Sequence, residues 1–149
     1  GYDEVAFLNH LKQFPGVCGK GVEITIRNAR GKGAAGVVDC AIKLQANMAY
    51  DRVAVLLDTD TDWTAKIEKL AKQKKIEVFT SEPCLEAMLL RAIGKPPIAG
   101  KDLKKQFDPY VQNDGTRRED YAEHFGLAVL QDARHLEPTI DRLLSLLGI

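Results

Sequence analysis

Hydrophobic and polar positions in the first part of the chain follow helical and strand patterns in turn. Apolar residues recur at helical spacing from the start of the chain to Phe14, which predicts a first helix. Three segments have the composition of strands. Residues 22–26 alternate between apolar and polar side chains and are rich in β-branched residues, and residues 53–57 and 76–80 are mainly apolar. Apolar residues at helical spacing also predict helices over residues 34–50, 65–75 and 84–93.

This alternation of strands and helices predicts an α/β fold, with a parallel sheet and helices on both of its faces. The pattern changes after Gly94, where no further strand is indicated. Helices are predicted there over residues 101–111, 119–134 and 139–147. We therefore predict an α/β core over residues 1–93 and a helical extension over residues 94–149 that packs on this core.

Composition changes this picture little. The 21 basic and 21 acidic side chains balance, so any attraction to a nucleic acid has to come from local basic clusters. Cys18, Cys40 and Cys84 lack the C-x-x-C spacing of zinc sites, which favours a reduced, intracellular protein. No apolar stretch approaches the roughly 20 residues of a membrane span. We predict a soluble, cytoplasmic protein.

The strongest candidate for chemistry is an acidic cluster, Asp58, Asp60 and Asp62, directly after the predicted strand 53–57. Ligands of parallel sheets bind beyond the carboxyl ends of the strands. Carboxylates so close together repel one another unless a cation offsets their charge, and carboxylate oxygens suit Mg²⁺ or Mn²⁺. The cluster therefore predicts a divalent metal site. The alternative is a solvated acidic loop that only caps the following helix.

Two further groups are predicted to lie at the same edge of the sheet. Arg27, Arg30 and Lys32 belong to a glycine-rich segment after the predicted strand 22–26, where cations and backbone amides could bind a phosphate. A plain strand-to-helix turn with solvated charges is the other interpretation. Glu86 begins the helix that follows the third predicted strand, and it is either a third acidic group of the site or an ordinary exposed glutamate.

Three motifs occur in an order known from one protein family. Gly1 is followed three residues later by Glu4, and Asp58 and Asp60 form a D-x-D after an apolar strand. A third motif, S-x-P-C-x-E, consists of Ser81, Pro83, Cys84 and Glu86. Over roughly residues 1–93 this order resembles the Toprim fold shared by topoisomerases, primases and OLD-type nucleases. More particularly, it resembles the RloB-like branch.

The resemblance implies a Toprim-like (Rossmann-like) sheet and a Mg²⁺- or Mn²⁺-dependent nuclease that cleaves DNA or RNA, with a role in prokaryotic defence. It implies four catalytic residues: Glu4, Asp58, Asp60 and Glu86. It implies four metal ligands: Glu4, Asp58, Asp60 and Asp62. Arg27, Arg30 and Lys32 would bind the substrate. The leading strand of the family and its closing glutamate have no counterpart here, and we expect them upstream in a longer protein.

Two other functions compete with the nuclease. A receiver-like binding module would also hold Mg²⁺ in an acidic pocket at strand ends, but it requires an acidic pair after its first strand and a lysine after a fifth. Neither a fifth strand nor such a lysine is indicated. A degenerate Toprim domain would bind metal without turnover and serve regulation or assembly, with a partner protein or as a homo-oligomer.

Overall fold

The computed structural model describes residues 1–17, 19, 21–30 and 33–149. The chain divides into two compact units. Unit 1 consists of Gly1 and Asn28–Cys84, and unit 2 consists of Tyr2–Arg27 and Leu85–Ile149. The first helix and the helix after the last strand thus belong to the same unit as the segment after Gly94, whereas the sequence pattern grouped them with the sheet.

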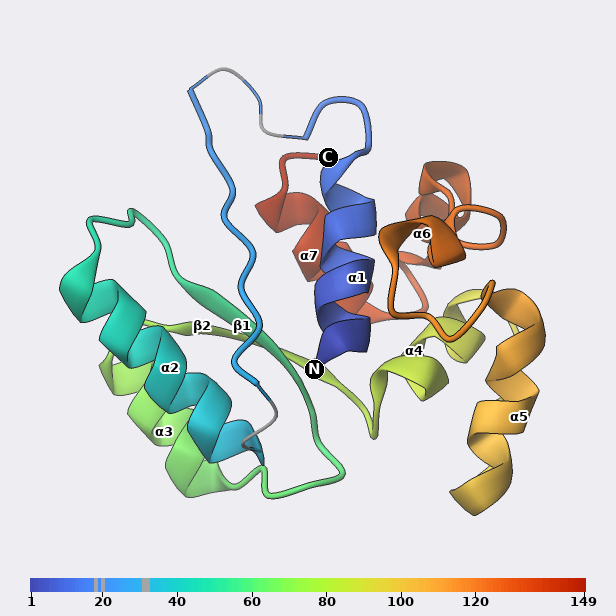
Figure 1. Cartoon of the computed structure of the whole chain (residues 1–149), viewed down its shortest axis with the longest axis horizontal. Coiled ribbons are helices and arrows are strands. Elements are labelled where there is room, and N and C mark those ends of the chain that lie inside the picture. Colours follow the sequence, from blue (N-terminus) through green and yellow to red (C-terminus); the bar gives the residue numbers. More distant parts are fainter. Residues whose placement is uncertain (18, 20, 31–32) are drawn as a thin grey trace. The chain divides into compact units, whose positions relative to one another are not determined.

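In its described residues, unit 1 contains a parallel pair of strands and two helices (Figure 1). In chain order its elements are α2 (Gly33–Asn47), β1 (Ala54–Asp58), α3 (Ala65–Gln73) and β2 (Glu77–Ser81). The register places Asp58 beside Ser81 at the carboxyl ends of the two strands. The predicted strands 53–57 and 76–80 are therefore confirmed, each displaced by one residue, and so is the mixed α/β class.

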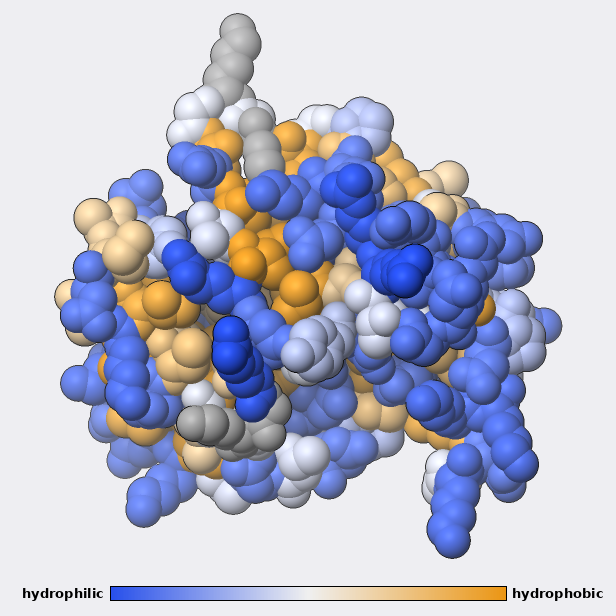
Figure 2. All heavy atoms as spheres, viewed as in Figure 1, coloured by the Kyte–Doolittle hydropathy of each residue, from blue (hydrophilic) through white to orange (hydrophobic). Residues whose placement is uncertain are grey.

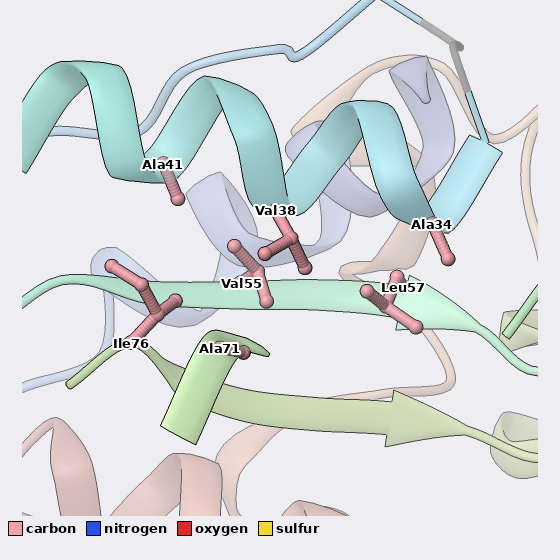
Figure 3. Close-up of a cluster of buried hydrophobic side chains, with 7 residues drawn as sticks. All are labelled: Ala34, Val38, Ala41, Val55, Leu57, Ala71 and Ile76. Carbon is pink, nitrogen blue, oxygen red and sulfur yellow. The ribbon is translucent and has the colours of Figure 1, made fainter. Parts of the chain in front are cut away.

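The core of unit 1 lies between the strands and the two helices. Val55 and Leu57 of β1 point toward α2, and the buried side chain of Val38 on α2 points back toward β1 (Figure 3). The whole buried cluster consists of Ala34, Val38, Ala41, Val55, Leu57, Ala71 and Ile76. Val55 and Leu57 lie on one face of β1, because alternate residues of a strand share a face. Val38 of α2 and Ala71 of α3 belong to the same cluster, so both helices pack on this face of the strand pair. A wider sheet with helices on both faces stays a prediction.

The predicted strand over residues 22–26 is wrong. In the part of the chain that the structure describes, this segment is extended but belongs to no strand. Val22, Glu23 and Thr25 are exposed, and the carbonyl oxygen of Ile24 accepts a hydrogen bond from the Lys12 ammonium at 2.6 Å. β-branched residues favour a pleated, half-buried surface, and without a neighbouring strand the pattern alone does not produce one.

Unit 2 is helical. Its α-helices are α1 (Tyr2–Lys12), α4 (Leu85–Ala92), α5 (Leu103–Phe107), α6 (Leu127–Ala133) and α7 (Pro138–Leu146). Short 3-10 helices occupy Gly100–Asp102, Asp108–Tyr110 and Arg118–Tyr121. The predicted helix 119–134 is thus interrupted, because Gly126 adopts an extended backbone immediately before α6.

Aromatic rings form much of the core of unit 2. Phe7, Tyr121 and Phe125 are almost fully buried, and the rings of Phe7 and Tyr121 meet edge to face at 5.6 Å. His10 is buried beside them, and its Nε2 lies 2.6 Å from the carbonyl oxygen of Phe125. Burial lowers the pKa of His10, against the opposing effect of this hydrogen bond. His10 is therefore a core histidine with a backbone partner.

Polar residues cover most of the face shown in Figure 2. Among the described residues, the large apolar side chains that are exposed each belong to a different segment of the chain: Tyr2, Val22, Met48, Leu70, Ile98 and Leu136. No described helix combines the length and the apolar character that crossing a lipid bilayer requires.

Candidate metal site at the strand ends

Asp58 and Asp60 extend from a backbone that is held in place. Asp58 ends β1 and is half-buried, whereas Asp60 is exposed in the turn that follows. The N–H of Thr59 donates to the carbonyl oxygens of Ser81 at 3.1 Å and of Pro83 at 3.0 Å, and the N–H of Asp60 donates to Pro83 at 3.0 Å. These bonds tie the D-x-D turn to the segment that leaves β2, so the two predicted metal ligands lie at a strand end that is hydrogen-bonded to this segment.

Ser81 lies beside Asp58 in the same register. Side chains at paired positions of neighbouring strands point to the same face, so the hydroxyl and the carboxylate share a face. Ser81 is 0% exposed, and its Oγ has no hydrogen-bond partner among the described residues. Buried hydroxyls almost always have one. Sequence reasoning gave Ser81 a place in a motif but no chemical role.

Asp62 has a different position from its two neighbours. Its carboxylate accepts hydrogen bonds from the backbone N–H of Ala34 at 2.6 Å and of Ala35 at 3.4 Å, and from the hydroxyl of Thr61 at 3.1 Å. These bonds, that of Ala34 foremost, lower the pKa of Asp62. Asp62 thus caps the first turn of α2, which precedes it in the chain, while α3 is capped by Thr64.

Gly33 makes this cap possible, and its replacement by Ala is expected to destabilise unit 1. Its φ of +69° is a left-handed conformation, and an added Cβ would lie 2.7 Å from Oδ1 of Asp62. Backbone strain alone costs a non-glycine residue about 1–2 kcal/mol. Gly94→Ala is the matched control, because Gly94 has a φ of +76° with nothing within 4 Å. Urea unfolding should show a larger loss of unfolding free energy for Gly33→Ala than for Gly94→Ala. Equal losses would contradict a clash between the added Cβ and the Asp62 carboxylate.

The predicted phosphate-binding residues are only partly placed in unit 1. Arg30 is exposed, has a φ of 60°, and its N–H donates to the side-chain oxygen of Asn28 at 2.8 Å. Arg27 is exposed and belongs to unit 2, and Lys32 lies outside the described residues. Arg30 is therefore the predicted cation that the structure describes on the loop before α2.

Unit 2 brings the other two predicted acidic residues together. The pKa of Asp3 is raised to about 6, mainly because the carboxyl group is partly buried. The negative charges of Glu86 and Glu4 raise this pKa further, whereas the positive charge of Lys104 lowers it. A surface hollow is lined by Asp3, Leu85, Glu86, Lys104, Phe107, Asp108, Val111, Asp114, Gly115 and Tyr121. Sequence reasoning gave Asp3 no role, although two successive carboxylates in the first turn of α1 were visible.

Asp3→Asn is expected to stabilise unit 2 near neutral pH. A pKa raised from 3.8 to about 6 means that the folded state holds the proton more tightly, so stability is lost as pH rises through this range. Asn carries no charge, and the gain at pH 7 should be about 1 kcal/mol, because the group is partly solvated and screened. Urea unfolding at pH 4–7 in EDTA measures it. The exposed Asp132→Asn should show no such gain, and a destabilised Asp3→Asn would refute the prediction.

Within residues 1–17, 19, 21–30 and 33–149, no three or more His, Cys, Asp or Glu side chains are arranged to hold a metal ion. Comparisons with protein-family models, with curated proteins and with solved structures find no match to the chain.

Proposed function

We propose that the protein is a Mg²⁺-dependent nuclease of the Toprim type, which cleaves phosphodiester bonds of DNA or RNA. The observation that supports it most is the strand-end loop: the half-buried carboxylate of Asp58 and the carboxylate of Asp60 extend from a backbone tied to Pro83. A role in prokaryotic defence rests on the family resemblance alone.

The residues of this loop fit a hydrated hard cation. Mg²⁺ keeps several waters in proteins and is commonly held by one or two carboxylates, which Asp58 and Asp60 can supply. Ser81 adds a buried hydroxyl without a partner among the described residues. Asp62 is the weakest of the proposed ligands, because its oxygens already accept hydrogen bonds from α2. Glu4 and Glu86 belong to unit 2, and their part in catalysis rests on the resemblance.

When bound, the cation would activate a water and stabilise negative charge on the phosphoryl group. The side chains of the loop have separate tasks. Asp58 and Asp60 bind the cation, and the hydrogen bonds to Pro83 hold their backbone, which limits the reorganisation that binding requires. The guanidinium of Arg30 is exposed and permanently charged, and it can bind a phosphate oxygen of the substrate.

The proposed activity is tested by incubating the purified protein with single-stranded DNA, double-stranded DNA and RNA, in Mg²⁺, Mn²⁺ or EDTA. We expect cleavage of at least one substrate that requires the metal and is absent from the double variant Asp58→Asn/Asp60→Asn. Cleavage that persists in this variant would refute the assignment. Metal binding without cleavage would instead support a regulatory Toprim-like domain, and labelling of Asp58 by a phosphoryl donor would support a receiver-like module.

A further inference from the structure

The buried hydroxyl of Ser81 has no structural explanation within the strand pair. It belongs to the last residue of β2 and is 0% exposed, and its Oγ lacks a partner among the described residues. A hydroxyl removed from water without a compensating hydrogen bond is unfavourable, and an Ala at this position would avoid that cost. A buried serine in this state therefore calls for a partner other than the residues that the structure describes.

The position of Ser81 indicates what this partner is. Asp58 is its register neighbour on β1, and the two side chains share a face at the carboxyl ends of the strands. The same Ser81 contributes its carbonyl oxygen to the bond from Thr59 N–H, so its backbone is fixed beside the D-x-D turn. Ser81 is thus the register neighbour, on the same face, of the residue whose carboxylate the proposed function assigns to the metal.

We propose that the Ser81 hydroxyl is a binding group for the hydrated divalent cation, beside the Asp58 carboxylate. A hydroxyl oxygen can accept a hydrogen bond from a water of the hydration shell or contact the cation through a lone pair, and the O–H group can donate a hydrogen bond to a carboxylate or a water. Groups of this kind orient the charged ligands. Their loss commonly weakens metal affinity by roughly 10–100-fold. This inference rests on the proposed metal site at Asp58.

A serine that only fills space or supports the fold would behave differently. In that case its replacement would lower the stability of the metal-free protein and leave metal affinity unchanged. If the hydroxyl binds the cation, its replacement should lower metal affinity without lowering the stability of the metal-free protein. The reason is that burial of the hydroxyl is unfavourable until the cation is bound. The two roles are therefore separated by measuring metal-free stability and metal affinity on the same variant.

The experiment uses the full chain and Mn²⁺ alone as the probe. Mn²⁺ affinity is measured from the electron paramagnetic resonance signal of the free ion, and thermal unfolding is followed in EDTA. For Ser81→Ala we expect Mn²⁺ affinity to fall by roughly 10-fold, with a melting temperature in EDTA equal to or above that of the wild type. Thr80→Val is the matched control: it removes the neighbouring hydroxyl, which points to the opposite face of β2, and should leave Mn²⁺ affinity unchanged.

Unchanged Mn²⁺ affinity in Ser81→Ala would overturn the inference, and so would a lower melting temperature in EDTA or an equal loss of affinity in Thr80→Val. Asp58→Asn separates this failure from failure of the proposed function. If Asp58→Asn loses affinity and Ser81→Ala does not, only the role of Ser81 is wrong. If the wild type itself does not bind Mn²⁺, the proposed metal site fails, and the inference fails with it.

Discussion

Asp58→Asn is expected to lower the affinity of the protein for Mn²⁺ by at least about 100-fold, or about 2.7 kcal/mol. The substitution removes one negative charge from a half-buried position at the end of β1 while keeping the shape of the side chain. Electrostatic interactions are weakened less by solvent there than at an exposed position. Asp60 is exposed, so Asp60→Asn should cost less, roughly 10-fold. Calorimetric titration with Mn²⁺ measures both affinities.

Asp39→Asn is the matched control for this prediction. Asp39 lies on α2 in the same unit, is exposed, and pairs with Lys43 at 2.9 Å, one turn along the helix. Its replacement removes the same charge from unit 1 away from the strand ends and should leave Mn²⁺ affinity within about 2-fold, since long-range interactions at the surface are screened. If Asp58→Asn and Asp39→Asn lower Mn²⁺ affinity equally, the affinity depends only on the net charge of the protein. That result would contradict a metal site at Asp58.

Arg91→Met is expected to lower the free energy of unfolding of unit 2 by about 3 kcal/mol. The Arg91 guanidinium of α4 forms two hydrogen bonds with the carboxylate of Glu137, the residue before α7. The Glu137 side chain is only 9% exposed. Met keeps much of the apolar stem of Arg but leaves a buried carboxylate without its cation, which is the costly way to break such a pair. Urea unfolding followed by circular dichroism measures the loss.

Arg52→Met makes the same chemical change at an exposed pair. Arg52 bonds the carboxylate of Glu77 in unit 1, but the two side chains are 62% and 33% exposed. Exposed ion pairs contribute little, so this variant should lose no more than about 0.5–1 kcal/mol. The double variant Arg91→Met/Glu137→Met should recover part of the loss of Arg91→Met. If Arg91→Met and Arg52→Met are equally stable relative to the wild type, burial does not strengthen the Arg91–Glu137 pair.

Local patterns predicted most of the elements. The continuous apolar run at residues 53–57 is typical of a strand covered by other elements, and β1 occupies Ala54–Asp58. The lysine-rich segment after Thr64 retained enough helical spacing to predict α3 correctly, with Ala71 as its buried residue. In both segments burial and backbone preference favour the same structure. Asp58 and Asp60 were placed at a strand end for the same reason, because D-x-D directly follows β1 in the chain.

The failures occurred where one segment depends on another. Residues 22–26 have the β-branched composition of a strand, but a strand also needs a partner, and composition does not reveal whether one is present. Residues 119–134 have continuous helical spacing, yet the helix is interrupted before α6, where the backbone of Gly126 is extended. Any residue can adopt the extended backbone of Gly126, so the spacing of apolar residues does not reveal this break.

The sequence by itself determined the order of helices and strands in unit 1 and the position of the acidic cluster after β1, because these depend on residues a few positions apart. The tertiary structure alone decided what each acidic residue contacts. Asp62 binds amides of Ala34 and Ala35, nearly thirty residues earlier, and Ser81 lies beside Asp58 through strand pairing. Hydrogen bonds act over about 3 Å in space whatever the separation along the chain, so only the fold decides that Asp62 caps α2.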